Sequence, residues 1–311
     1  MRLLKVLLVL SVLIVLACAP AHATATGPGG GPGNPLGTLV TPELTDPVIA
    51  ALPALPTPYR PYRSSICRSA KPACIDRVIT TMQRRLQPLA RSCSHDAIFA
   101  LAYLRVTQNV KNATDHGYFA DRRWLTRLDA VFAHMYFRTM DRYRDGRGVP
   151  PAWKVALDAS HDRQMNGLGD FMLNMNAHIN NDFPRALVVD GLTAKDGTSH
   201  KPDHNAYNDR LDTLYGPVFG EEARRFDPTF NTYDVPPFTL TAAGTIMRLW
   251  REAVWRNAEM LADARTPQQR AMVGHYIDQY AATQARMIKA MPIFRSTDHS
   301  KARDAYCATH R

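Results

Sequence analysis

The stretch Asn174–Leu187, NMNAHINNDFPRAL, places a histidine and an aspartate four residues apart in a segment with helical periodicity. Side chains at i and i+4 lie on one face of a helix, so His178 and Asp182 should contact each other. On a wheel of about 100° per residue, Asp182 falls inside an apolar arc and His178 lies at its edge. The arc consists of Leu168, Met172, Met175, Ile179, Phe183 and Ala186.

The position of Asp182 on an apolar face needs a physical explanation. An ionised aspartate there is costly unless it is paired, hydrogen-bonded or bound to a metal. The pair therefore has two interpretations. It binds a metal or carries out acid–base chemistry, or it is a structural pair that links helices at a polar point of the core.

The rest of the chain from about Ile66 onward also has helical periodicity. The alternation of apolar and polar residues that indicates a β-strand does not persist in it. Thr266 should cap the last long helix, with Pro267 at its first position. The sequence therefore predicts an all-α fold, with a single multi-helix domain over residues 64–311. Helices are expected over 74–89, 94–110, 124–143, from Pro150, around His178, and over 203–214, 240–264 and 266–291.

Other polar residues also interrupt apolar helical faces. Asp129 lies in the middle of a predicted helix, on its inner face, where it could pair with Arg127 or with another arginine. His95 and Asp96 flank the inner face at the start of the second predicted helix, although an acidic residue also suits a first helical turn. These three residues are candidates to join His178 and Asp182 in one site.

The stretch HKPDHNAYND contains His200, Asp203 and His204 close together. Pro202 should interrupt the helix that would align the two histidines. We therefore expect a solvent-exposed polar loop there, with a functional site as the alternative.

The N-terminus has the pattern of an export signal. Arg2 and Lys5 precede an apolar run too short for a stable membrane span, and Ala21-His22-Ala23 suggests cleavage before Thr24. The chain is thus expected to be secreted or periplasmic after loss of residues 1–23. A lipoprotein anchored at Cys18 is the alternative. Residues 24–63, rich in Pro and Gly, are expected to form a flexible or polyproline-like linker.

The cysteines that follow Cys18 are even in number, which in an exported protein favours disulfides. Cys67 and Cys74 are close enough in sequence to pair easily, which leaves Cys93 to pair with Cys307. Their spacings do not match those of zinc ligands.

The chain carries a formal charge of +10, and removal of Arg2 and Lys5 with the signal lowers this to +8. An anionic small-molecule substrate fits this charge, but the arginines do not form runs, so no specific nucleic acid is expected. No later segment is apolar and long enough to span a membrane. The motifs of serine hydrolases, P-loop proteins and dinucleotide-binding proteins are absent from the sequence.

The runs LDAVFAHMYFRTM, VPPAWKVALDA and LGDFMLNMNAHINNDFPRAL resemble domain-of-unknown-function family 5995, a set of mainly bacterial helical proteins. The resemblance covers roughly residues 93–290, and its most specific part is Asn176–Asp182. It implies one helical domain and makes the His178 segment a family signature. It implies no mechanism.

A weaker resemblance is to the zinc-dependent phospholipase C and single-strand nuclease group. His178, Asp182 and Pro184 are similar to the His-x-x-x-Asp pair and the following proline of those secreted helical enzymes. That group also uses the mature N-terminal amine and a second His-x-x-x-Glu helix, which have no counterpart here. The similarity therefore serves as an analogy for chemistry alone.

These observations lead to two functional hypotheses. In the first, His178, Asp182, Asp129, His95 and Asp96 hold a divalent zinc, manganese or iron ion, and Asp129 or Asp182 acts as general base in hydrolysis of a phosphoester or ester. In the second, the protein is not an enzyme. It binds a lipid, peptide or glycan, and His178–Asp182 is a structural pair.

Overall fold

The computed structural model describes residues 47–49, 51–232, 240–295 and 297–311. Within these ranges all regular secondary structure is helical, apart from isolated bridges between Met165 and Arg295 and between Thr193 and Ser199. The predicted all-α fold is confirmed. The predicted signal peptide, Cys18 and residues 24–46 of the predicted linker lie outside the described residues.

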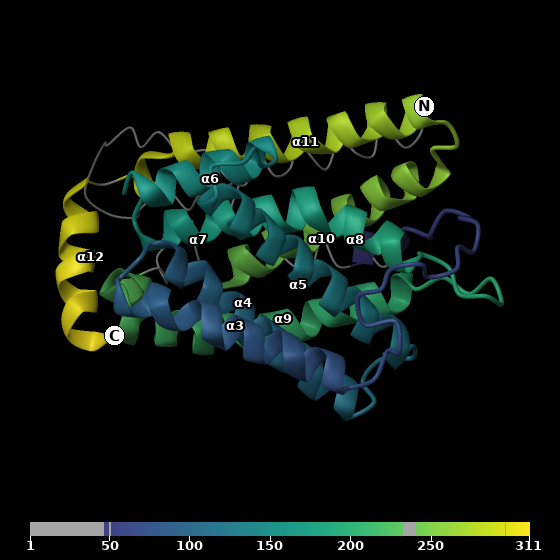
Figure 1. Cartoon of the computed structure of the whole chain (residues 1–311), viewed down its shortest axis with the longest axis horizontal. Helices are drawn as coiled ribbons and strands as arrows, with labels where there is room; N and C mark the ends of the chain where they lie inside the picture. Colours follow the sequence, from purple (N-terminus) through teal and green to yellow (C-terminus); the bar gives the residue numbers. More distant parts are fainter. Residues whose placement is uncertain (1–46, 50, 233–239, 296) are drawn as a thin grey trace, which may run out of the picture.

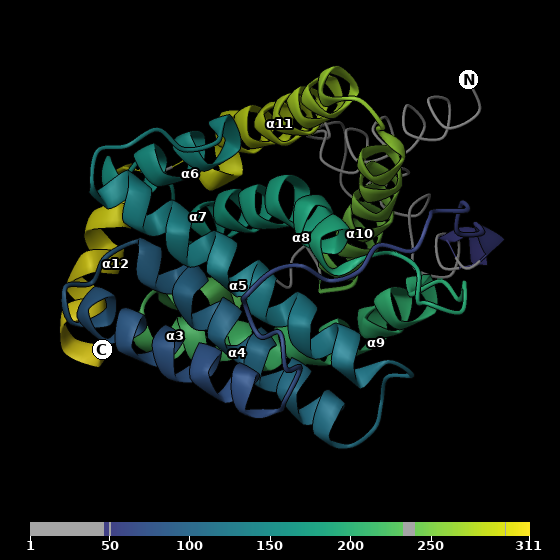
Figure 2. The same cartoon turned by 45° about the vertical axis from the view of Figure 1, so that its right-hand side comes forward.

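A helical column runs through the middle of the molecule. It consists of α7 (Gly167–Asn176), a π-helical turn η1 (Ala177–Asp182) and α8 (Phe183–Asp190). Figures 1 and 2 show other helices on several sides of it. The helices that contact the column are α4 (Asp96–Asp115), α5 (Arg122–Arg144), α6 (Pro151–His161), α10 (Leu240–Asp263) and α11 (Pro267–Ala290).

The start of the column is fixed by close packing. The Asn166 side chain accepts a hydrogen bond from the backbone N–H of Gly169, which caps α7. Gly167 donates its N–H to Asp227 Oδ2, and a Cβ at Gly167 would lie 2.5 Å from that same oxygen. Only glycine therefore allows Asp227 to approach so closely.

The outer helices complete the bundle. α3 (Ala73–Arg91) packs on α4 and α5, whereas α9 (Lys201–Arg225) packs beside α4 and α10. The prediction that Pro202 interrupts this region was wrong. Pro202 occupies the first turn of α9, where its missing N–H would have no helical partner in any case. The predicted cap of α11 is present, because Thr266 and Gln269 form a reciprocal capping box.

The segment 51–63 belongs to the packed body, although its composition resembles that of a linker. Leu55 donates its N–H to Glu259 Oε1 at 2.7 Å, and Arg256 Nη1 donates to the Pro53 carbonyl at 2.9 Å. Both charged residues lie on α10, where they pair with each other at 2.9 Å while almost fully buried. The segment thus covers a buried ion pair and bonds to both of its members.

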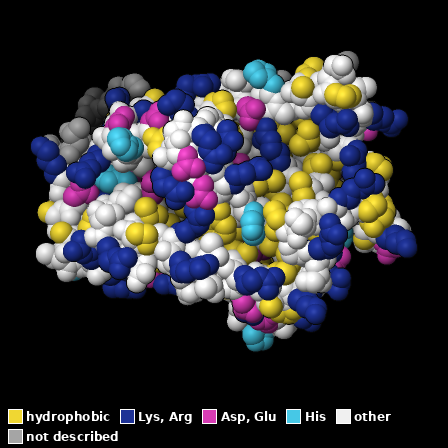
Figure 3. All heavy atoms as spheres, viewed as in Figure 1, with side chains coloured by type: hydrophobic (Ala, Val, Ile, Leu, Met, Phe, Trp, Pro, Cys, Tyr) yellow, Lys and Arg dark blue, Asp and Glu magenta, His cyan; other side chains and the backbone are white. Residues whose placement is uncertain are grey.

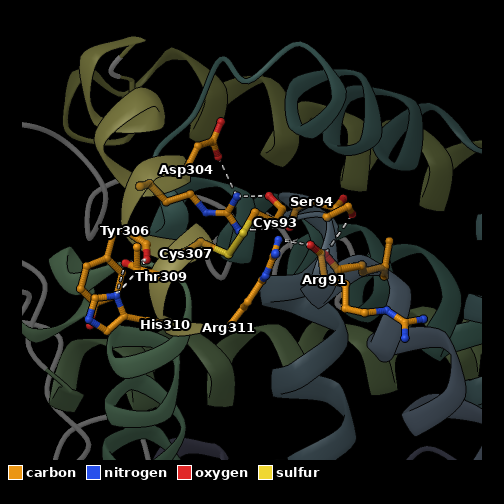
Figure 4. Close-up of a disulfide and its surroundings, with 12 residues drawn as sticks. Arg91, Cys93, Ser94, Asp304, Tyr306, Cys307, Thr309, His310 and Arg311 are labelled. Atoms are coloured by element: carbon orange, nitrogen blue, oxygen red, sulfur yellow. Dashed lines mark hydrogen bonds and ion pairs between the residues drawn. A yellow bond between two sulfur atoms is a disulfide. The ribbon is translucent and has the colours of Figure 1, made fainter.

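The last helix, α12 (Thr297–His310), was not predicted, and it lies across one end of the bundle (Figure 1). Figure 4 shows that Cys307 on α12 forms a disulfide with Cys93. Nearby, the buried Arg303 donates hydrogen bonds to the carbonyls of Cys93 and Ser94. The second disulfide joins Cys67 and Cys74, so both predicted cysteine pairs are confirmed.

The surface is mixed in charge. Figure 3 shows Lys and Arg side chains spread over the visible face among acidic and apolar ones. Several of these charges form pairs, such as Arg85 with Asp141 at 2.8 Å and Arg105 with Glu221 at 2.6 Å. Among the helices that the structure describes, none has the length and apolar character needed to cross a bilayer.

The two disulfides should contribute unequally to stability. In the chain-entropy model, the Cys93–Cys307 bond closes a loop with a sequence separation of 214 residues, and the Cys67–Cys74 bond one of 7. Replacing Cys93 and Cys307 together by serine should lower the free energy of unfolding by about 5 kcal/mol, against about 2 kcal/mol for the Cys67/Cys74 pair. Urea unfolding of both double variants measures this, and equal losses would contradict it.

Candidate functional site

The π-helical turn at the centre of the column has a local cause in Pro184. In a continuous α-helix the Pro184 ring would collide with the carbonyl of Asn180 and leave it without a donor. The structure instead widens here, and the N–H of Phe183 bonds to the carbonyl of His178, five residues earlier. Arg185 donates a side-chain hydrogen bond to the neighbouring carbonyl of Asn181. Such π-turns occur frequently at functional sites.

The turn holds His178 and Asp182 in direct contact. His178 Nδ1 donates to Asp182 Oδ2 at 3.1 Å, and both side chains are almost fully buried. Asp182 also accepts from Trp153 Nε1 at 2.9 Å and from Asn181 Nδ2 at 2.7 Å. The carboxylate therefore has three donors, and its bond to Nδ1 fixes the ring orientation of His178.

The other ring nitrogen of His178, Nε2, is buried and has no hydrogen-bond partner among the described residues. Phe132 stacks on the imidazole with ring centroids 3.6 Å apart, and the Tyr103 ring lies edge-on at 4.6 Å. Burial lowers the pKa of His178, although the bond to Asp182 opposes this effect. A neutral imidazole with Nδ1 as donor leaves Nε2 as a free hydrogen-bond acceptor and proton acceptor.

His178 lines a cavity of about 130 Å³ between the column and helices α4, α5, α9 and α10. An apolar cavity of about 150 Å³ in another protein stays dry and binds benzene. The lining here is mostly apolar as well. Its aromatic members are Phe99, Tyr103, Trp124, Phe132, Phe171, Phe183, Tyr207, Tyr215 and Phe219.

Asp129 lines the same cavity as His178, as a member of one site should. Of the two arginine pairings considered for Asp129, the one with Arg127 was wrong, because Arg127 binds Asp190 at 2.6 Å. Asp129 Oδ2 is buried with no hydrogen-bond partner in the described structure. Burial raises the pKa of Asp129 to about 7.

Three polar cavity residues were missed or misplaced by the sequence patterns. Asp203 was expected in an exposed loop, but it is buried in the first turn of α9, lines the cavity and accepts hydrogen bonds from the N–H groups of Ala120 and Asp121. His204 was expected in an exposed loop, but it lies within α9, is 2 % exposed and lines the cavity. Arg251 on α10, 6 % exposed, also lines the cavity and was not identified as a candidate. Its position one helical turn from Met247 and Trp255, both apolar, was the available signal.

His95 and Asp96 do not line this cavity. His95 Nδ1 instead bonds to Asp170 Oδ2 at 2.5 Å, and its Nε2 lies 3.4 Å from Asp304 on α12. Burial, with the nearby Asp170 charge, raises the pKa of Asp96 to about 6. The predicted set therefore divides in two. His178 and Asp129 line the cavity, with Asp182 behind His178, whereas His95 and Asp96 lie near α12.

No group of three or more His, Cys, Asp or Glu side chains within the described ranges is arranged to hold a metal ion. His178 and Asp182 remain the pair from which a metal site would have to be built. The cavity itself presents isolated polar atoms on aromatic walls. That arrangement can hydrogen-bond a mostly apolar molecule or activate a single water.

Residues 75–291 match the family of unknown function DUF5995. The chain belongs to this family, and the matched range contains the column and the cavity. Searches of curated proteins and of solved structures found no match.

The raised pKa of Asp129 makes stability depend on pH in a defined direction. The folded pKa of about 7 exceeds the unfolded value of about 4. Asp129 is protonated in both the folded and the unfolded protein below about pH 4, where it costs no stability. As the pH rises from about 4 to about 7 the free energy of unfolding falls, because ionisation is easier in the unfolded chain. Replacing Asp129 by Asn should leave stability nearly unchanged at pH 4 and raise it by about 2 to 4 kcal/mol at pH 8.

Urea unfolding of both proteins at the two pH values measures this effect. The control is Asp263→Asn, at the exposed end of α10, which should leave the free energy of unfolding unchanged at both pH values. An equal difference between wild type and Asp129→Asn at both pH values would mean that Asp129 titrates normally.

Proposed function

We propose that this protein binds a small amphipathic molecule, mostly apolar, inside the cavity beside His178. The observation that carries the proposal is the cavity of about 130 Å³ with its aromatic lining. Protein interiors are normally packed to crystal density, so a void of this size forfeits contacts that a ligand would restore.

The unsatisfied polar atoms support the same proposal. His178 Nε2, Asp129 Oδ2 and the hydroxyls of Tyr103 and Tyr215 are buried without partners among the described residues, and all four residues line the cavity. Most buried polar groups in native proteins are hydrogen-bonded, and each exception costs about 1 to 3 kcal/mol. A ligand with one or two polar groups would satisfy some of these atoms.

Filling the cavity should abolish binding. Indole, a neutral and mostly apolar probe not much larger than benzene, should bind the purified protein at one molecule per chain in isothermal titration calorimetry. Val106→Phe and Ala102→Leu add carbon atoms at positions that line the cavity, so each should weaken probe binding by about tenfold or more.

Val155→Phe on α6 is the matched control, because Val155 is also partly buried but does not line the cavity. Probe binding should survive this change. Binding that is equally strong in all four proteins would place the probe elsewhere and contradict the proposal.

A second candidate is hydrolysis of an ester with His178 as general base, and the free Nε2 of an oriented histidine favours it. His178 Nε2 would take a proton from water as the water oxygen attacks the ester carbonyl. The ester C–O bond would then break, and the proton would pass to the leaving alkoxide. In this scheme Asp182 positions the imidazole, as the aspartate of a catalytic triad does.

With p-nitrophenyl octanoate as substrate, His178→Ala should lower turnover by about a hundredfold or more, whereas His134→Ala, exposed on α5, should not. The metal-dependent form of this candidate is tested by elemental analysis for zinc, manganese and iron. Near-stoichiometric metal that is lost in His178→Ala and Asp182→Ala would support it. No turnover by the wild type would refute hydrolysis of this ester and leave the binding proposal standing.

We further propose that the protein is exported, as its N-terminal sequence suggests. Two disulfides are compatible with a secreted or periplasmic location.

A further inference from the structure

Arg251 is a buried cation on the cavity wall, and the part of the chain that the structure describes gives it no acidic partner. No carboxylate among the described residues lies within ion-pairing distance of its guanidinium. The neighbouring acids Asp209 and Asp212 bind Arg248 instead, at 3.1 and 2.6 Å. Burial lowers the pKa of Arg251 to about 10, and the side chain remains charged at neutral pH.

The protein contacts of Arg251 orient its guanidinium without neutralising it. Nε donates to Asn208 Oδ1 at 2.6 Å, and Nη2 donates to the carbonyl of His204. The guanidinium carbon lies 5.4 Å from the ring centre of Phe183 and 5.8 Å from that of Tyr207. These four partners are neutral, and Nη1 makes no hydrogen bond within the described structure.

An uncompensated buried charge is costly, and the usual compensation is an ion of opposite sign. Tyr215 offers a second donor beside Arg251. Its hydroxyl is buried without a partner among the described residues, and Tyr215 lines the same cavity as Arg251. A cation and a free hydroxyl on an apolar wall form a site for a small anion attached to an apolar body.

We propose that the ligand of this cavity is an amphipathic carboxylic acid, whose carboxylate binds Arg251 Nη1 and the Tyr215 hydroxyl. This inference rests on the proposed binding function and names its ligand class. The apolar body of the acid then lies along Phe183 and Phe132, whose rings stack with centres 4.6 Å apart. Phe132 in turn stacks on His178, so the chain of contacts leads from the carboxylate site to the free Nε2.

Matched ligands that differ only in the head group test this assignment. Octanoate, 1-octanol and octylamine should each compete with indole for the purified protein. Octanoate should bind about tenfold to a hundredfold more tightly than 1-octanol, because a hydrogen bond to a charged group is worth more than a neutral one. Octylamine should bind most weakly. Octyl phosphate in a fourth titration distinguishes a carboxylate from a phosphate head group, and tighter binding of the phosphate would overturn the carboxylate assignment.

Variants of Arg251 test whether this residue causes the preference for octanoate over 1-octanol. Arg251→Met should remove the preference for octanoate and keep binding of 1-octanol, whereas Arg251→Lys should keep part of the preference. Arg248→Met on the same helix is the control and should retain it, because Arg248 does not line the cavity. If Arg251→Met fails to fold, Arg251→Lys and the wild-type ligand series still decide the question.

The outcomes separate this inference from the proposed function. Equal affinity of the wild type for octanoate and 1-octanol, or a preference that survives in Arg251→Met, would overturn the carboxylate assignment alone. If neither these ligands nor indole binds the wild type, the cavity-binding proposal fails and the assignment fails with it.

Discussion

The central helical column is contacted by other helices on several sides, so its polar side chains are buried. The stability of the structure depends on giving these side chains hydrogen-bond partners. Asp182 meets this constraint with three donors, from His178, Asn181 and Trp153. Trp153 is fully buried on α6, so the carboxylate also fixes where that helix packs. Removing any one donor would leave part of a buried charge unsatisfied, which is costlier than loss of a surface contact. The same bond that stabilises the column therefore determines which nitrogen of His178 is free.

The cavity follows from the shapes of the residues around that column. Rings such as Phe132 and Tyr103 pack against the imidazole and against each other, but flat rings held by neighbours cannot collapse into every gap. Buried polar atoms that have no partner in the described ranges occur in the same place as this void. Each feature alone has a structural explanation, but both together are typical of a site that is complete only with a ligand.

The sequence predicted most of the helices, the Cys67–Cys74 pair and the proximity of His178 to Asp182, because these depend on local spacing. The Cys93–Cys307 pair, separated by 214 residues, followed only because these two cysteines were left over. It could not predict the π-turn, since a wheel of about 100° per residue assumes the regular geometry that Pro184 interrupts. Nor could it place His95, because its partners Asp170 on α7 and Asp304 on α12 are both distant in sequence. Arg251 was missed because arginines on helices usually face solvent, and only the neighbouring helix α9 supplies the partners that bury it.

The segment 51–63 and α12 both lie outside the residues that match the family, yet each covers groups that the matched region buries. Glu259 and Arg256 bond to the first, and His95 lies beside Asp304 on the second. Folded proteins are stable by only about 5 to 15 kcal/mol, so uncovering charged groups at both ends would consume much of that margin. In this chain the region that matches the family therefore leaves buried charged groups uncovered at both of its ends. Its boundaries in sequence are not those of a unit that folds independently.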